Sequence, residues 1–199
     1  MTEWSAYYDA VRDRPPHETL LEALESFAEP GFAVDLGCGD GRDTVELLRR
    51  GWRVVAIDAE PEAIERLRAR VGHPPALETE VARFEDARWP SAELLNAGFS
   101  LPFCHPDRFD DLWSRIRNSI RPGGRFCGQL FGERDEWADE EDMTFLTRDA
   151  AEALFDGFEL EQFDEEETDG ETAVGVPKHW HIFHVVARKI REPTLASQS

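Results

Sequence analysis

Residues 33–42 read A-V-D-L-G-C-G-D-G-R, and this stretch decides the fold of the chain. It begins with a short apolar run that carries Asp35, and glycines then stand at every second position, at Gly37, Gly39 and Gly41. Glycines at this spacing allow positive φ and let a small ligand approach the main chain where a Cβ would collide. The stretch therefore predicts a β-strand that turns into an α-helix around a ligand.

The sequence around this stretch predicts two successive strand–helix units. A strand at 33–36 and a helix at 42–50 are followed by a second apolar strand at 53–57, which ends on Asp58. Pro61 can occupy the first turn of the next helix. Further strands are expected at 76–81, 93–97 and 125–131, and helices at about 20–27, 107–121 and after Thr147.

The last part of the chain has a different pattern. Strands at 158–163 and 179–187 are separated by the acidic segment 164–175 rather than by a helix, which predicts an antiparallel hairpin. Repeated strand–helix units followed by this hairpin predict an α/β three-layer sandwich, with a Rossmann-like, mostly parallel sheet. One domain is expected over residues 1–190, including an N-terminal cap and helix over 1–30, and a flexible tail over 191–199.

The charge of the chain limits its partners. Its 199 residues include 22 Lys and Arg against 42 Asp and Glu, a net charge of -20. This is the wrong sign for binding nucleic acid or an anionic membrane, so we expect neither as a partner. We expect a monomer or a homodimer. A cationic protein partner, a high-salt source or simply a solvated acidic surface would each explain the excess of acids.

The cysteines and the chain start indicate a compartment. The three cysteines, Cys38, Cys104 and Cys127, are odd in number and show no C-x-x-C spacing, which is typical of reduced thiols. The first residues lack the pattern of a signal peptide, and no apolar run approaches the roughly 18 residues of a spanning helix. We therefore expect a soluble, cytoplasmic protein.

The glycine spacing separates two kinds of ligand. A dinucleotide loop reads G-x-G-x-x-G, whereas this chain reads D-x-G-x-G-x-G, which disfavours NAD. Asp58 ends the neighbouring strand, and a carboxylate there can accept bonds from two ribose hydroxyls. The alternatives are a tight turn without a ligand for the glycines and a simple helix N-terminal acid for Asp58.

From about residue 19 to residue 189 the chain resembles class I methyltransferases that use S-adenosylmethionine, most specifically in D-L-G-C-G-D-G at 35–41. The resemblance implies seven strands, of which the last two form the hairpin, and S-adenosylmethionine as the cofactor. It implies that the glycine loop lies near the methionyl part, Asp58 at the ribose, and residues 84–86 at the adenine. Arg83 stands where many members carry an acid. The implied cofactor residues are Asp35, Gly37, Cys38, Gly39, Gly41, Asp58, Ala59, Phe84, Glu85 and Asn96.

Four looser motifs resemble the small TehB-like methyltransferases, which are named for tellurite resistance. They are L-N-A-G-F-S-L-P-F at 95–103, P-G-G-R-F at 122–126, Q-L-F-G at 129–132 and K-H-W-H-I-F at 178–183. This resemblance implies a small-molecule acceptor, such as a thiol, a chalcogen oxyanion or another anion.

Methyl transfer from a sulfonium is an in-line displacement, so alignment of the reactants supplies much of the acceleration and a general base is not obligatory. If the acceptor must lose a proton, the candidate bases are Tyr7, His17, His105 and His179. Candidates for holding the acceptor are Tyr8, Arg14, Arg134, Trp137, Lys178 and His181. Surface ion pairs and core packing are the alternative roles of these residues.

Two further hypotheses remain open, and a metal site is not expected. His179 and His181 would face one side of a strand and His184 the other, which disfavours shared metal coordination. The chain could bind S-adenosylmethionine without transferring its methyl group, as a sensor or a partner protein. Nucleotide-dependent oxidoreduction is a third possibility, which the glycine spacing disfavours.

Overall fold

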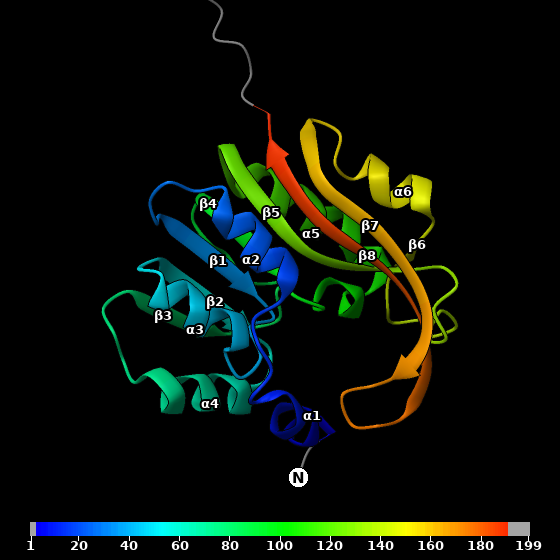
Figure 1. Cartoon of the computed structure of the whole chain (residues 1–199), viewed down its shortest axis with the longest axis horizontal. Helices are drawn as coiled ribbons and strands as arrows, with labels where there is room; N and C mark the ends of the chain where they lie inside the picture. Colours follow the sequence, from blue (N-terminus) through cyan, green and yellow to red (C-terminus); the bar gives the residue numbers. More distant parts are fainter. Residues whose placement is uncertain (1–2, 191–199) are drawn as a thin grey trace, which may run out of the picture.

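The computed structural model describes residues 3–190 and contains one mixed sheet of 8 strands. Its order is β3-β2-β1-β4-β5-β8-β7, and β6 lies beside β5 (Figure 1). The predicted tail at 191–199 lies outside the described residues. The strands are β1 (Phe32–Leu36), β2 (Arg53–Asp58), β3 (Leu77–Val81), β4 (Ala92–Ala97), β5 (Ile120–Gly132), β6 (Phe145–Leu146), β7 (Phe158–Glu171) and β8 (Pro177–Lys189).

Helices cover both faces of the sheet, which confirms the predicted three-layer sandwich. One core cluster joins α2, α3 and α4 to the sheet, and a second joins α5 and α6 to the opposite face (Figure 1). The helices are α1 (Glu3–Val11), α2 (Glu18–Glu25), α3 (Arg42–Arg49), α4 (Pro61–Val71), α5 (Pro106–Ser119) and α6 (Arg148–Ala153), and a short 3-10 helix, η1, spans Leu101–Phe103. No helix within residues 3–190 is both long and apolar enough to cross a membrane.

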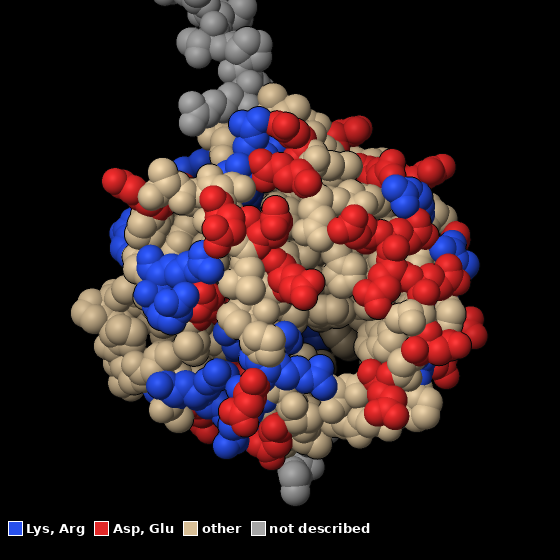
Figure 2. Space-filling view, in the orientation of Figure 1, with Lys and Arg blue, Asp and Glu red and all other residues tan. Residues whose placement is uncertain are grey.

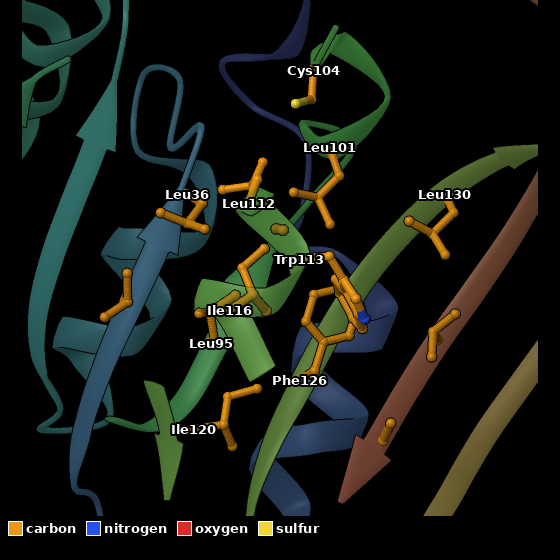
Figure 3. Packing of buried hydrophobic residues seen from close by; sticks show 14 of the residues in the cluster. Leu36, Leu95, Leu101, Cys104, Leu112, Trp113, Ile116, Ile120, Phe126 and Leu130 are labelled. Carbon is orange, nitrogen blue, oxygen red and sulfur yellow. The ribbon is translucent and has the colours of Figure 1, made fainter. Parts of the chain in front are cut away.

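Helix α5 forms the larger core with the middle of the sheet. Its residues Leu112, Trp113 and Ile116 are buried, and the Trp113 ring packs edge-on against Phe126 of β5, with ring centroids 5.2 Å apart (Figure 3). Aromatic pairs in this geometry add attraction to the burial of apolar area. The apolar spacing of the helix therefore predicts its buried face correctly.

The sheet order places a switch point beside the glycine loop. Strand β1 pairs in parallel with β2 on one side and with β4 on the other. Strands β2 and β3 therefore lie on one side of β1, and β4 and β5 lie on the other. Ligands of such sheets bind at the carboxyl ends of the strands next to this point. The loop after β1, the end of β2 and the end of β4 therefore meet at one edge.

Several boundaries differ from the predictions. Helix α5 ends at Ser119 and β5 begins at Ile120, because residues 121–124 loop out between the pairs Ala92–Ile120 and Leu94–Arg125. The segment 164–171, expected as a connection, continues strand β7. Its carboxylates face basic groups across the strands, which offsets their mutual repulsion. The aromatic opening forms helix α1, which the sequence did not predict as a helix.

Candidate active site

The three loop glycines have different structural tasks. Their φ angles are all positive, +69° at Gly37, +53° at Gly39 and +90° at Gly41. A Cβ at Gly37 would lie 2.3 Å from the Ser100 Cβ, and one at Gly41 would lie 2.3 Å from the Leu67 Cδ1. At Gly39 the nearest neighbour would be the Tyr8 ring, at 3.6 Å. Gly37 and Gly41 therefore allow Ser100 and Leu67 to pack against the loop, and only Gly39 borders space for a ligand.

The N–H groups of the loop are largely bonded within the protein. Those of Gly37 and Cys38 donate to the carbonyl oxygen of Ile57 at 2.8 and 3.0 Å, that of Gly39 to the Asp58 Oδ2 at 2.8 Å, and that of Gly41 to the carbonyl oxygen of Cys38 at 3.0 Å. A phosphate cradle needs free N–H donors. The bonded donors of this loop do not form such a cradle, and this argues independently against a dinucleotide.

Asp58 lies at the end of β2 with its carboxylate partly bonded. Its Oδ2 accepts from Gly39 N, and its Oδ1 accepts from Glu60 N at 2.9 Å. Burial raises the pKa of Asp58. Each carboxylate oxygen can accept a further bond, so the side chain is held in place and can still bind a pair of hydroxyls.

Asp35 and Asn96 lie beneath the loop, not in it. Both are buried, and the Asn96 Nδ2 donates to Asp35 Oδ1 and to Asp43 Oδ2, each at 2.9 Å. The Thr44 hydroxyl donates to Asp35 Oδ2 at 2.5 Å, and Asn96 Oδ1 accepts from the Cys127 thiol. The cofactor contacts of Asp35 and Asn96 stay predictions, since the contacts in the structure are all within the protein. These side chains support the loop from the neighbouring strands.

The predicted adenine loop is organised by arginines. The buried Glu85 carboxylate pairs with Arg83 Nη2 at 2.9 Å, and Arg115 donates to the carbonyl oxygens of Phe84 and Glu85. Arg83 thus neutralises Glu85 at the position where an acid was expected. Phe84 is half-buried, and Ala59 lies exposed directly after β2, so their proposed cofactor contacts remain predictions.

Helix α1 lies over the glycine loop. Tyr8 is buried beside Gly39, and the charge of Asp58 acts on its hydroxyl. Tyr8 therefore lies beside the loop and Asp58, and its acceptor contact stays a prediction. Trp4 packs on Phe103, with ring centroids 5.4 Å apart, which holds the helix down. Burial raises the pKa of Tyr7, so its hydroxyl is a poor source of a general base at neutral pH.

His17 uses both ring nitrogens within the protein. Its Nδ1 lies 2.8 Å from Asp43 Oδ2, and its Nε2 lies 2.8 Å from Arg42 Nη1. A neutral ring with the proton on Nδ1 satisfies both bonds. The role of His17 as a base stays a prediction, and its Nε2 would have to leave Arg42 in order to accept a proton. A Cβ at Gly98 would lie 2.7 Å from His17 Nδ1, so this glycine makes room for the ring.

The turn after β4 holds a strained aromatic residue. Phe99 is the non-glycine residue that adopts positive φ, at 55°, within the described part of the chain. Its N–H donates to Gln129 Oε1 at 3.1 Å, and Gln129 Nε2 donates to Thr19 at 3.0 Å. The Phe99 ring lies 5.3 Å from that of His17. Strain held in this way clusters at functional sites, which favours Phe99 as a wall of the acceptor side.

Lys178 is a buried structural cation. Its ammonium pairs with the buried Asp135 and lies 4.1 and 4.0 Å from the ring centroids of Trp137 and Trp180. Burial lowers the pKa of Lys178. The predicted acceptor contact of Lys178 is corrected, because the group is enclosed by its partners. Trp137 keeps a half-buried side chain beside them.

Four other candidates are engaged elsewhere. His181 is buried, with Nδ1 accepting from Arg134 N at 3.1 Å and Nε2 bonded to Glu165 at 2.9 Å. The remaining three are Arg134, bound by Glu165 and Glu167; His179, bound by Asp169 and Glu167; and His105, which caps α5 by accepting from Asp107 N. Their substrate or base roles stay predictions, and in the structure their printed contacts are to groups of the protein itself.

The site includes residues that sequence reasoning missed. Arg42 and Asp43 directly follow the third loop glycine, and Phe99 lies within the motif at 95–103. Their positions in the sequence alone could therefore have indicated them. Gln129 and His184 reach the site only through the pairing of β5 with β8. Within residues 3–190, no group of three His, Cys, Asp or Glu side chains is arranged to hold a metal ion.

A hollow separates helix α1 from the far end of the β7–β8 hairpin. Figure 2 shows Lys and Arg side chains gathered on its α1 side and Asp and Glu side chains on its hairpin side. The chain thus presents opposite charges across the opening, despite its overall acidity.

Comparison with known families agrees with this geometry. The methyltransferase domain family matches residues 33–124, which include the glycine loop, Asp58 and β4. A carboxy-S-adenosyl-L-methionine synthase of Pseudomonas putida is 29% identical over 151 residues, covering 68% of this chain and 60% of that protein. One from Pseudomonas fluorescens is 30% identical over 152 residues, with the same coverage. The chain therefore spans less than two thirds of the length of these relatives.

Solved structures share the fold at low identity. TehB from Haemophilus influenzae superposes with a TM-score of 0.77 at 14% identity, covering 92% of this chain and 65% of that one. The N-methyltransferase NodS from Bradyrhizobium japonicum, in complex with S-adenosyl-L-homocysteine, gives 0.69 at 17% identity, covering 94% and 99%. These likenesses confirm the predicted architecture.

Proposed function

We propose that this chain, whose residues 33–124 match a methyltransferase domain family and whose fold is shared by TehB, transfers a methyl group from S-adenosylmethionine to a small-molecule acceptor. The observation that carries the proposal is the glycine loop, whose N–H groups are bonded internally, set directly beside the half-buried Asp58. The bonded loop N–H groups do not suit a phosphate, and the Asp58 carboxylate keeps acceptor capacity that suits the ribose hydroxyls of the cofactor.

S-adenosylmethionine, when bound, supplies an electrophilic methyl group on a sulfonium sulfur. The chain contributes binding and alignment. Gly39 leaves room at the loop, Asp58 accepts from the ribose, and Tyr8 covers the loop from above. Holding donor and acceptor in line removes much of the entropic barrier of a bimolecular displacement.

The acceptor side favours a nucleophile that is already deprotonated. Among the proposed bases, His17 has both nitrogens bonded and burial raises the pKa of Tyr7. Phe99 and Phe131 offer apolar walls, with ring centroids 6.3 Å apart. A thiolate or an oxyanion needs no base and would fit this arrangement better than an alcohol or a protonated amine.

Calorimetric titration tests the cofactor. We expect micromolar binding of S-adenosylmethionine and S-adenosylhomocysteine and none of NAD. Asp58→Ala should weaken binding about 100-fold, because hydrogen bonds to a carboxylate are lost. Asp110→Ala, an exposed acid on α5, is the matched control and should bind as the unaltered protein does. Binding of NAD alone would refute the proposal.

Radiolabelled methyl transfer to thiols, oxyanions, amines and carboxylates tests the reaction itself. Turnover of a thiol or an oxyanion is the expected result. Cofactor binding without transfer to any acceptor would favour the alternative of a non-catalytic sensor or partner protein.

A second candidate follows from the relatives named carboxy-S-adenosyl-L-methionine synthases, which share up to 30% identity over 152 residues. In that case S-adenosylmethionine would be the substrate, and a carboxylate-bearing co-substrate would supply a carboxyl group that replaces a proton of S-adenosylmethionine. Mass spectrometry of the nucleoside product separates the two reactions, since methyl transfer leaves S-adenosylhomocysteine and carboxylation leaves a product heavier than S-adenosylmethionine.

A further inference from the structure

We propose that His184 and Glu166 form a proton-accepting dyad on the acceptor side, and that the acceptor is a neutral thiol whose proton passes to His184 Nδ1 during methyl transfer. The inference rests on the proposed function, since it names a catalytic residue and an acceptor class for the same reaction. His184 lies on β8, and Glu166 lies on the neighbouring strand β7.

The register of the sheet places His184 at the edge where the ligand site lies. Ala97, the last residue of β4, pairs with Gly128 of β5, and Gly128 pairs with Val185 of β8. One step further along β5, Gln129 pairs with His184, so this histidine lies just beyond the end of β4. Sheets of this kind bind their ligands at the carboxyl ends of the parallel strands. His184 is therefore at the correct edge for the acceptor.

The His184 side chain also lies on the correct face of the sheet. Residues paired across adjacent strands share a face, so His184 and Gln129 point to the same side. The Gln129 amide donates to Thr19 of α2 at 3.0 Å and accepts from the N–H of Phe99 at 3.1 Å. The Phe99 ring centroid lies 6.3 Å from that of His184 and 5.3 Å from that of His17. His184 thus borders the turn after β4.

The His184 ring is held at one nitrogen and open at the other. Its Nε2 lies 3.0 Å from Glu166 Oε2. A carboxylate accepts from an N–H, so the proton of the neutral ring lies on Nε2 and the lone pair on Nδ1. Nδ1 has no hydrogen bond among residues 3–190, and 22% of the side chain is exposed. The ring is therefore oriented as a proton acceptor.

This arrangement distinguishes His184 from the other histidines of the chain, of which there are five. Three of them have both ring nitrogens within reach of groups of the protein, namely His17, His179 and His181. His105 uses Nδ1 to accept from a backbone N–H, and His73 has no carboxylate partner in the described part of the chain. Within residues 3–190, only His184 combines a carboxylate on Nε2 with an open Nδ1.

The proposed step balances in atoms and charge. The thiol S–H bond breaks and its proton passes to His184 Nδ1, while the thiol sulfur forms a bond to the methyl carbon of S-adenosylmethionine. The bond between that carbon and the sulfonium sulfur breaks, and its electron pair stays on the sulfur. The products are a methyl thioether and S-adenosylhomocysteine. Glu166 stabilises the imidazolium until its proton is released to water.

A thiol suits this base better than an alcohol or an amine. The ordinary pKa values of a thiol and an imidazole are roughly 8.5 and 6.5, so a proton passes between them easily. An alcohol holds its proton far more tightly. An amine is an ammonium ion at neutral pH, and the carboxylates of Glu166 and of Asp164, which pairs with His184 across the strands, would keep it protonated.

The test compares two thiols that differ in ionisation. 2-Mercaptoethanol is protonated at neutral pH, whereas 4-nitrothiophenol is already ionised and needs no base. His184→Gln should lower turnover of 2-mercaptoethanol about 100-fold or more and leave that of 4-nitrothiophenol unchanged. Calorimetry should show unchanged affinity for S-adenosylhomocysteine. His73→Gln, at an exposed histidine after α4, is the matched control and should turn over both thiols normally.

A second variant tests His184 by chemical rescue. His184→Ala leaves space at the base, and imidazole added to the buffer should restore part of the lost turnover of 2-mercaptoethanol. If imidazole restores none of the lost turnover, His184 is not the base.

Glu166 is tested as a positioning residue. Glu166→Gln removes the charge that fixes the proton on Nε2 and stabilises the imidazolium, so turnover of 2-mercaptoethanol should fall about tenfold. Turnover of 4-nitrothiophenol should be unchanged. A merely structural role of Glu166 would lower both rates equally, and that result would overturn its assignment.

The outcomes separate this inference from the proposed function. If His184→Gln lowers turnover of both thiols equally, or of neither, the dyad is wrong while methyl transfer stands. If the unaltered protein methylates 4-nitrothiophenol or an oxyanion but not 2-mercaptoethanol, the neutral thiol is wrong and methyl transfer again stands. If it methylates no acceptor at all, both the inference and the proposed function fail.

Discussion

The two sides of the candidate active site are built from different materials. The proposed cofactor side is made of backbone and of buried polar side chains. There the Gly39 N–H donates to Asp58, and the Asn96 side chain donates to Asp35. Next to the proposed acceptor side, aromatic rings surround a buried ion pair, in which Lys178 and Asp135 lie beside Trp137 and Trp180. The first arrangement recognises a fixed ligand, whereas the second can change by side-chain substitution without altering the sheet.

This difference explains which side can be assigned. A positive φ and close packing at Gly37 and Gly41 allow only glycine there, so this part of the site can be recognised in the sequence. An aromatic wall allows many substitutions of similar volume, so its residues point to no particular acceptor. Four predictions test the comparison.

The largest effect is expected from the acceptor side. Lys178→Met leaves Asp135 buried without its cation, which should lower the free energy of unfolding by about 3–5 kcal/mol. Urea denaturation measures the loss. Adding Asp135→Asn should recover part of it, because the buried charge is removed. Equal stability of Lys178→Met and the unaltered protein would show that the pair does not hold this side together.

On the cofactor side, Gly41→Ala should cost about 3 kcal/mol, because φ is +90° and the new Cβ would collide with Leu67. The variant should also bind S-adenosylhomocysteine more weakly. Gly175→Ala is the matched control, since φ is +81° there but nothing lies within 4 Å, and only about 1–2 kcal/mol should be lost. A similar loss in the free energy of unfolding at both positions would show that the contact with Leu67 adds no cost at Gly41.

The cofactor side should also respond to pH through Asp35. Burial raises the pKa of Asp35 to about 7, and the charge of Asp43 adds to the rise. Because the folded protein then binds this proton more tightly than the unfolded chain, stability should fall by about 2 kcal/mol between about pH 5 and pH 7. Asp35→Asn should flatten this slope in urea denaturation. An unchanged slope would assign the pH dependence to other groups.

The hairpin beside the acceptor side should show the opposite sign and the smallest effect. Arg148, His181 and Arg134 lower the pKa of Glu165 to about 2. This stabilisation is present above the ordinary pKa of a glutamate and is lost as the pH falls through the lowered value. Glu165→Gln should therefore cost up to about 1 kcal/mol at neutral pH and less near pH 3. A cost that grows on acidification would contradict the assignment.

Much of the fold could be predicted because its elements carry local signals. The β1 loop, the end of β2 at Asp58, the amphipathic α5 and the antiparallel ending each follow from periodicity or glycine placement. The extension of β7 to Glu171 could not be predicted, because a run of acids disfavours a strand until its cross-strand partners are known.

The site followed the same division. Asp58 and the loop glycines lie where the motif predicts. The contacts of the histidines and cations could not be predicted, because residue type says nothing of partners. His181 and Lys178 are buried in pairs, and His17 serves Arg42, facts that depend on contacts between segments far apart in sequence.

The strand order also has a consequence for the folding of the chain. Strand β8, the last described, lies inside the sheet between β5 and β7, and β7 pairs with no other strand among the described residues. During synthesis, β7 and its row of carboxylates therefore have no partner strand until β8 has been made. The mutual repulsion of those acids would keep the unpaired strand from associating with strands of other molecules. The same carboxylates that repel one another in the folded hairpin therefore protect the nascent chain from aggregation.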